Sequence, residues 1–145
     1  MTTTDRTTHE AEAGTPEQVV RTFCRLMGEK DFDAIAPLFT EDAIYHNVGT
    51  EPAVGREATL SALRFQLGAF DPINWRIIRL AVDGDTVLTE RVDEITARGI
   101  TAPIPVMGSF VVQDGKIAVW RDYFDMALAQ RLMAGEDASA VVPGL

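Results

Sequence analysis

The chain has 145 residues, 46% of them hydrophobic and 24% charged, and its 22 acidic and 13 basic side chains give a net charge of -9. This size suits one domain able to bury a core, and the composition excludes a wholly disordered chain. The negative charge repels nucleic acid phosphates and anionic lipids, so the sequence predicts neither as a partner and favours a neutral, apolar small molecule as the ligand.

The start of the chain and its single cysteine bear on the compartment. Residues 1–14 are polar, lack the apolar core of a secretory signal and are predicted to form a disordered tail, which leaves 15–145 as a single domain. Cys24 is the only cysteine, so no intrachain disulfide can form and we expect a buried core thiol. No stretch approaches the ~20 apolar residues that span a bilayer, so we expect no membrane contact and a cytoplasmic location.

Helices are predicted in four places. Thr15 followed by Pro16 and Gln18 is typical of a helix start, and the helix should run to about Gly28. A short helix is expected at 32–39, limited by a proline, and a third at 56–69 with leucines on one face. A fourth should follow a cap at Asp125.

Strands are predicted from alternation and from β-branched and aromatic content at 43–48, 75–82, 86–95, 106–112 and 117–124. Asp83-Gly84-Asp85 and Asp114-Gly115 tolerate positive φ, so each is expected to turn an antiparallel hairpin. Pro103 and Pro105 predict a loop or a sheet edge between the hairpins. Helices followed by an antiparallel sheet indicate an α+β fold.

The strand at 86–95 points to a buried site. Alternate side chains share a face, so Val87, Thr89, Arg91, Asp93 and Ile95 should lie together, opposite a face that carries two glutamates. The glutamate face suits solvent, which leaves Arg91 and Asp93 pointing inward. A buried charge is tolerable only when it is paired, and the two residues supply one pair.

Two further strands add polar groups to the same interior. Asp122 shares a face with Ala118, Trp120 and Phe124, opposite Ile117, Val119, Arg121 and Tyr123, and Tyr45 and Asn47 share a face with Ala43. The three strands would thus form an apolar cavity with two carboxylates, one guanidinium, one phenol and one amide. A purely structural salt bridge explains this pattern about as well as an active site does.

Three ordered motifs, Tyr45-x-Asn47, Thr89-Glu90-Arg91-Val92-Asp93 and Trp120-Arg121-Asp122-Tyr123-Phe124-Asp125, resemble those of the limonene-1,2-epoxide hydrolase family, within the nuclear-transport-factor-2-like and SnoaL-like superfamily. The resemblance covers roughly 16–132. It implies a cone-shaped α+β roll in which a curved mixed sheet and helices close a deep apolar pocket. It also implies hydrolysis of an apolar epoxide to a trans diol, without a cofactor or metal.

The resemblance further implies roles for the site residues. Asp122 matches the general base, Asp93 the general acid and Arg91 the residue that bridges them. Tyr45 and Asn47 match the groups that hold the attacking water. Trp120 and Phe124, which flank Asp122 in the strand, are expected to line the substrate pocket.

Two alternatives remain open on the same fold. One is a steroid-isomerase or polyketide-cyclase relative, with an aspartate moving a proton at carbon, although an arginine between two acids suits water activation better. The other is a noncatalytic module that binds an apolar ligand. The strand at 75–82 is apolar on both faces, which, with the resemblance, predicts a homodimer.

Overall fold

The protein is described here by a computed structural model that covers residues 14–71 and 73–145. All of the expected disordered tail except its last residue lies outside the described residues. Within the described ranges, no helix is long and apolar enough to cross a membrane.

The helices begin where the sequence places their caps. Thr15 accepts from the backbone N–H of Gln18 at the start of α2 (Pro16–Glu29), and Asp125 accepts from that of Leu128 at the start of α5 (Met126–Met133). The second predicted helix is split into α3 and a 3-10 turn, because Pro37 has no N–H to continue the α-helical hydrogen bonds. The others are α3 (Phe32–Ile35), η1 (Ala36–Leu38), α4 (Arg56–Leu67) and α6 (Ala138–Val141).

The strands of the described chain form one six-stranded sheet in the order β2-β1-β6-β5-β4-β3. Both predicted hairpins are confirmed, and β1 and β6 pair in parallel, so the sheet is mixed. The strands are β1 (Phe39–Asn47), β2 (Ala53–Val54), β3 (Ile73–Asp83), β4 (Thr86–Ala97), β5 (Ile100–Gln113) and β6 (Lys116–Tyr123).

The two prolines lie inside β5 rather than in a loop. Pro103 and Pro105 pair with Glu94 and Val92 of β4, so the expectation of a loop is wrong and that of a sheet edge is right. Pairing of β5 with β6 begins only at Met107. Along 100–106, β5 therefore has β4 as its only strand neighbour in the described chain, and a missing proline N–H breaks no ladder there.

One bulge changes a predicted face. The β5–β6 pairing shifts between Val111 and Val112, where Val119 and Ile117 are the successive partners and the intervening Ala118 has none. Ile117 is fully buried in the core, although strict alternation places it opposite Trp120. The inward positions nearer the end of β6 are unaffected.

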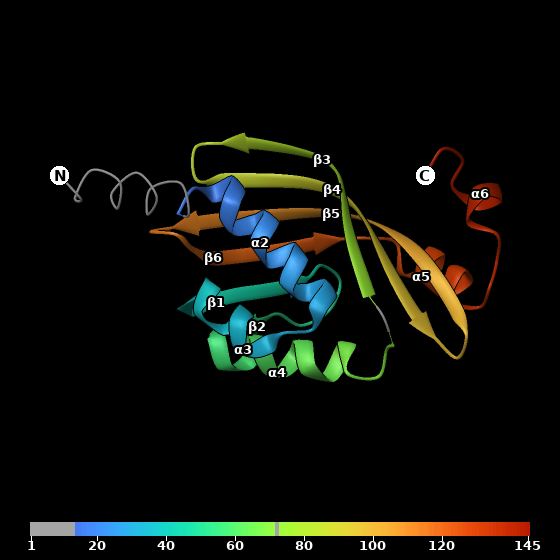
Figure 1. Cartoon of the computed structure of the whole chain (residues 1–145), viewed down its shortest axis with the longest axis horizontal. Helices are drawn as coiled ribbons and strands as arrows, with labels where there is room; N and C mark the ends of the chain where they lie inside the picture. Colours follow the sequence, from blue (N-terminus) through green and yellow to red (C-terminus); the bar gives the residue numbers. More distant parts are fainter. Residues whose placement is uncertain (1–13, 72) are drawn as a thin grey trace.

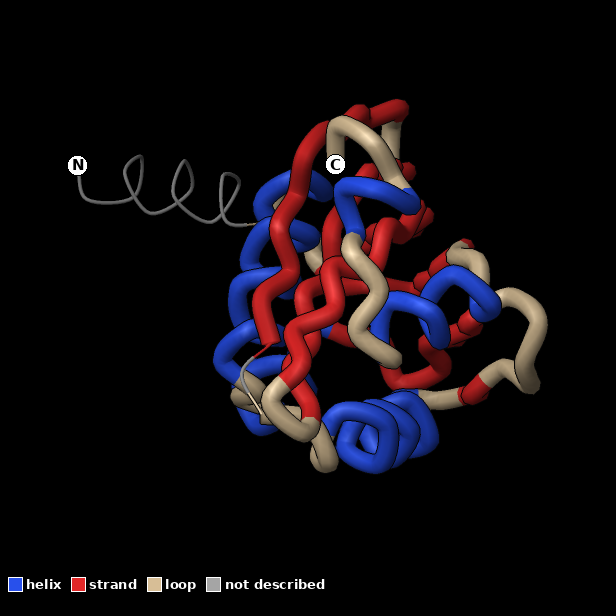
Figure 2. The backbone as a smooth tube through the Cα atoms, turned by 90° about the vertical axis from the view of Figure 1, so that its right-hand side faces the viewer, coloured by secondary structure: helices blue, strands red, loops and turns tan. Residues whose placement is uncertain are grey.

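The core lies between α2 and the sheet, as Figure 1 shows for the helix crossing the strands. Phe23 of α2 makes edge contacts with Phe39, Phe110 and Trp120, all on strands. In the profile of Figure 2 the strands curl beside α2, and α4 lies below them.

Candidate active site

Arg91 is the centre of a buried cluster that joins two strands across a third. Its side chain starts on β4 and reaches over β5 to Asp122 on β6. On β5, Gly108 pairs with Thr89 on one side and with Asp122 on the other, so it lies directly beneath the guanidinium. Because glycine has no side chain, the arginine can lie flat over the strand.

The guanidinium holds both carboxylates. It donates from Nε and Nη2 to Asp93 at 3.0 and 2.9 Å, and from Nη1 and Nη2 to Asp122 at 3.2 and 2.8 Å. Nη1 also lies 3.3 Å from the hydroxyl of Thr89. Arg91 is 0% exposed, Asp93 7% and Asp122 4%, so these charge-assisted bonds are shielded from water. The inward direction predicted for these three side chains is confirmed.

Two tryptophans enclose the cluster. The ring of Trp75, on β3, lies 4.5 Å from the guanidinium carbon of Arg91, a cation-π contact. Trp120 is fully buried and donates from Nε1 to Asp122 Oδ1 at 2.8 Å. With Arg91 and Trp120 both donating to it, Asp122 has a fixed orientation.

Burial affects the protonation of Asp93. It raises the pKa of this carboxyl above its usual range, against the opposing influence of Arg91. If both acids were ionised, the cluster of Arg91, Asp93 and Asp122 would carry one net negative charge away from water. With the proton on Asp93 the cluster is neutral, so we expect the proton to reside there.

Tyr45 and Asn47 lie beside the cluster on β1, next to β6. The Tyr45 hydroxyl donates to Gln66 Oε1 at 3.0 Å, and Asn47 Nδ2 donates to the same oxygen at 3.4 Å. Burial raises the pKa of Tyr45 further above its normal value, so the phenol stays neutral. Its ring stacks on Trp120 with centroids 4.0 Å apart. Gln66 thus links α4 to the two residues that the motif singles out.

These groups border a cavity of about 130 Å³, here called the inner hollow. Phe124 lines it as expected, whereas Trp120 does not, because it lies behind Tyr45 and Asp122. The hollow is lined by Tyr45, Asn47, Leu63, Gln66, Leu67, Phe70, Trp75, Asp93, Ile95, Ile104, Val106, Asp122 and Phe124. It is an apolar space with two acids, two amides and a phenol at its wall, and it is large enough for a few non-hydrogen atoms.

Other polar groups are placed as structural ones. Cys24 is a buried core thiol, as predicted, and burial raises its pKa to about 12, so it is protonated at neutral pH. Across 14–71 and 73–145, no group of three His, Cys, Asp or Glu side chains could hold a metal ion. The expectation that the chain works without a metal or a cofactor stays a prediction.

Three residues of the site were not predicted from the sequence. Gly108 and Trp75 gain their positions from strand pairing, which the alternation within one strand does not show. Gln66 could have been found, because it follows Leu63 by three positions and so lies on the leucine face of its helix. A polar side chain on that apolar face would have indicated a residue of the site.

Fold and site together define a class: the chain has the α+β fold of SnoaL-like, nuclear-transport-factor-2-like proteins, with an acid–arginine–acid cluster in its curved sheet. Residues 14–133 match the model of the limonene-1,2-epoxide hydrolase catalytic domain. The chain therefore belongs to the limonene-1,2-epoxide hydrolase family and is an epoxide hydrolase by class.

Individual proteins that the chain resembles are described as epoxide hydrolases or as similar enzymes. Epoxide hydrolase EphG of Mycobacterium tuberculosis is 36% identical over 107 residues, covering 74% of this chain and 71% of EphG. A solved M. tuberculosis epoxide hydrolase of the same type is 32% identical with a TM-score of 0.75, over 92% of this chain and 97% of that one. SalBIII, an epoxide hydrolase/cyclase-like enzyme in pyran ring formation, is 25% identical with a TM-score of 0.70, over 77% and 92%.

Proposed function

We propose that the protein hydrolyses an apolar epoxide in one step, with Asp122 as general base and Asp93 as general acid, to give a trans diol. The observation that carries this proposal is the single guanidinium shared by two buried carboxylates, together with the burial that raises the pKa of Asp93. Such a pair divides naturally into an acid that holds a proton and a base that accepts one.

The proton movements follow from these positions. Asp122 takes a proton from a water molecule as the water oxygen attacks one ring carbon, and Asp93 gives its proton to the epoxide oxygen as the carbon–oxygen bond breaks. Attack comes from the face opposite the breaking bond, so the two hydroxyls end up trans. The carbonyl oxygen of Asn47 is suited to accept the water's second hydrogen, because its amide nitrogen already donates to Gln66.

Labelled water tests the one-step route. In a single turnover with enzyme in excess and H₂¹⁸O as solvent, we expect the diol to carry one ¹⁸O in its new hydroxyl, detected by mass spectrometry. In a route through a carboxylate ester, the first turnover transfers an enzyme oxygen instead. Unlabelled diol from that first turnover would therefore contradict the proposal.

The pH dependence of kcat/KM should show an alkaline limb set by Asp93. Its carboxyl must be protonated to act as an acid, so the rate falls as pH rises through its raised pKa. Asp93→Asn should lower kcat/KM by about 10²- to 10⁴-fold, because an amide cannot transfer the proton. The residual activity of this variant should lack the alkaline limb. An unchanged limb in the variant would assign it to another group.

A cyclase is the second candidate, favoured by the resemblance to SalBIII. The same acid and base could open an epoxide with a hydroxyl of the substrate in place of water, which closes a ring. A substrate with an epoxide and a nearby hydroxyl distinguishes the two: a diol with solvent ¹⁸O supports hydrolysis, and an unlabelled cyclic ether supports cyclisation.

We propose that the chain forms a homodimer through the outer face of its sheet. Leu88, Met107 and Tyr123 lie there on adjacent strands and are 46%, 48% and 49% exposed. A patch of this kind is typical of an interface between subunits. Light scattering should give twice the chain mass of 15.9 kDa for the wild type.

Met107→Glu tests that interface, because it places a charge in an apolar contact and should shift the measured mass to that of one chain. Phe65→Glu is the control, since Phe65 is 87% exposed on α4, away from the outer face, and should leave the mass unchanged. A monomeric wild type, or a dimeric Met107→Glu protein, would contradict the proposal.

A further inference from the structure

A second, larger cavity adjoins the inner hollow. It has a volume of about 670 Å³, against about 130 Å³ for the hollow, and is here called the outer chamber. Phe70 and Ile95 line both spaces, so the two cavities meet at these side chains. A molecule whose epoxide lies against Asp93 and Asp122 therefore has room for a much longer remainder in the chamber.

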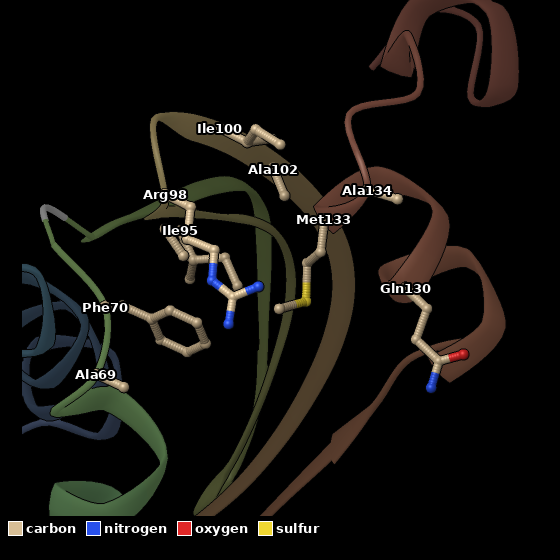
Figure 3. A pocket seen from close by; sticks show the side chains of 10 residues that line it. Ala69, Phe70, Ile95, Arg98, Ile100, Ala102, Gln130, Met133 and Ala134 are labelled. Atoms are coloured by element: carbon tan, nitrogen blue, oxygen red, sulfur yellow. The ribbon is translucent and has the colours of Figure 1, made fainter.

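The chamber has apolar walls and one charged group. Phe70, Ile95 and Met133 face its interior in Figure 3, and Ile100 and Ala102 add apolar surface from β5. Of its lining residues only Arg98 and Gln130 have polar side chains, and none is acidic. An alkyl or alicyclic chain fits these walls by burial of apolar surface.

Arg98 lies at the tip of the hairpin between β4 and β5, where it adopts a positive φ of 52° before Gly99. Figure 3 shows its side chain directed into the chamber, with the guanidinium between Phe70 and Met133. It makes no hydrogen bond and no ion pair with any other described residue, although the chain has 22 acidic residues. The guanidinium is therefore available to a ligand.

The two ends of the cavity differ in what they offer an anion. At the inner end, all five N–H donors of Arg91 are taken by the two acids and Thr89, so the buried cluster has no free donor for a negatively charged group. At the outer end, Arg98 attracts it without a competing acid in the lining. A molecule with an epoxide and a separate anion would enter in one direction only, with the epoxide first.

We propose that the substrate is an elongated epoxide with an apolar chain and a carboxylate at its far end, bound by Arg98. This inference rests on the proposed epoxide hydrolysis. A single guanidinium in a lining without acidic side chains matches a singly charged carboxylate, which accepts two parallel N–H bonds. Arg98 follows Asp93 by five positions, so at about 3.3 Å per residue their Cα atoms lie at most about 17 Å apart, which sets the scale of the substrate.

Paired substrates test the proposal. The probes are a long-chain epoxy carboxylate, its methyl ester and a short neutral aryl epoxide, all below their aggregation concentrations. We expect the wild type to prefer the carboxylate over the ester by about three- to tenfold in kcat/KM, through a lower KM. The preference should shrink at high ionic strength, because Arg98 is exposed to solvent.

Arg98→Gln should reduce the carboxylate-to-ester ratio to about one, because the amide has no charge, and Arg98→Lys should keep part of the preference. Using the ratio cancels any general loss of activity. Arg25→Gln is the matched control: it removes the same charge from the exposed side of α2, outside both cavities, and should retain the wild-type ratio.

The outcomes separate this inference from the function on which it rests. If the short aryl epoxide gives diol but the carboxylate has no advantage over the ester, or Arg98→Gln keeps that advantage, the role of Arg98 is overturned and epoxide hydrolysis stands. If none of the three probes gives a diol, epoxide hydrolysis itself is overturned.

Discussion

Asp122→Asn should reduce the turnover of any epoxide substrate by about 10⁴-fold while leaving the fold intact. The amide has nearly the shape of the carboxylate, and its oxygen, in the place of Oδ1, can still accept from Arg91 Nη1 and from Trp120 Nε1. It cannot take a proton from water, so the nucleophile is no longer activated. Diol formation followed by mass spectrometry measures the loss, and circular dichroism checks the fold.

Asp125→Asn is the matched control for this variant. Asp125 lies three residues further along the same segment, but its side chain caps α5 by accepting from the N–H of Leu128. Asparagine caps helices about as well as aspartate, so both stability and turnover should be unchanged. If Asp122→Asn kept more than a tenth of the wild-type rate, Asp122 would not be the base.

The inward side of β4 could be predicted because the rule behind it is local. Successive residues of a strand point to opposite faces, and Glu90 and Glu94 mark one face for solvent. Arg91 and Asp93 then have to point into the protein, and the structure confirms this. Asp122 follows from the same rule, because the bulge in β6 lies before it and leaves its direction unchanged.

What the sequence could not show depends on which strands lie side by side. The reach of Arg91 to Asp122 requires β5 between them, with Gly108 opposite both partners, and the prolines of β5 concealed the full length of that strand. Trp120 was expected at the pocket wall because it shares a face with Asp122. Tyr45 stacks on Trp120, so Trp120 lies behind Tyr45 and donates to Asp122 but does not line the inner hollow.

Gly108→Ala should lower both stability and turnover, although the glycine itself has no functional group. A Cβ at this position would overlap the Nη1 atom of Arg91 and lie 2.8 Å from Thr89 Oγ1 and 2.9 Å from Asp122 Oδ1. Atoms on two neighbouring strands would have to shift at once, in a cluster where every charge is buried. We expect a loss of about 3 kcal/mol in the free energy of unfolding, because overpacking adds to weakened ion pairs.

Turnover should fall further than the loss of stability alone explains, because the two acids keep their alignment only while Arg91 lies flat over β5. Urea denaturation measures the first effect, and kcat at a temperature where the variant is folded measures the second. Gly28→Ala is the control: its Cβ would meet only Ile73 O, at 3.5 Å, and alanine favours the helix. A Gly108→Ala protein as stable and active as Gly28→Ala would mean that Arg91 does not depend on the bare backbone beneath it.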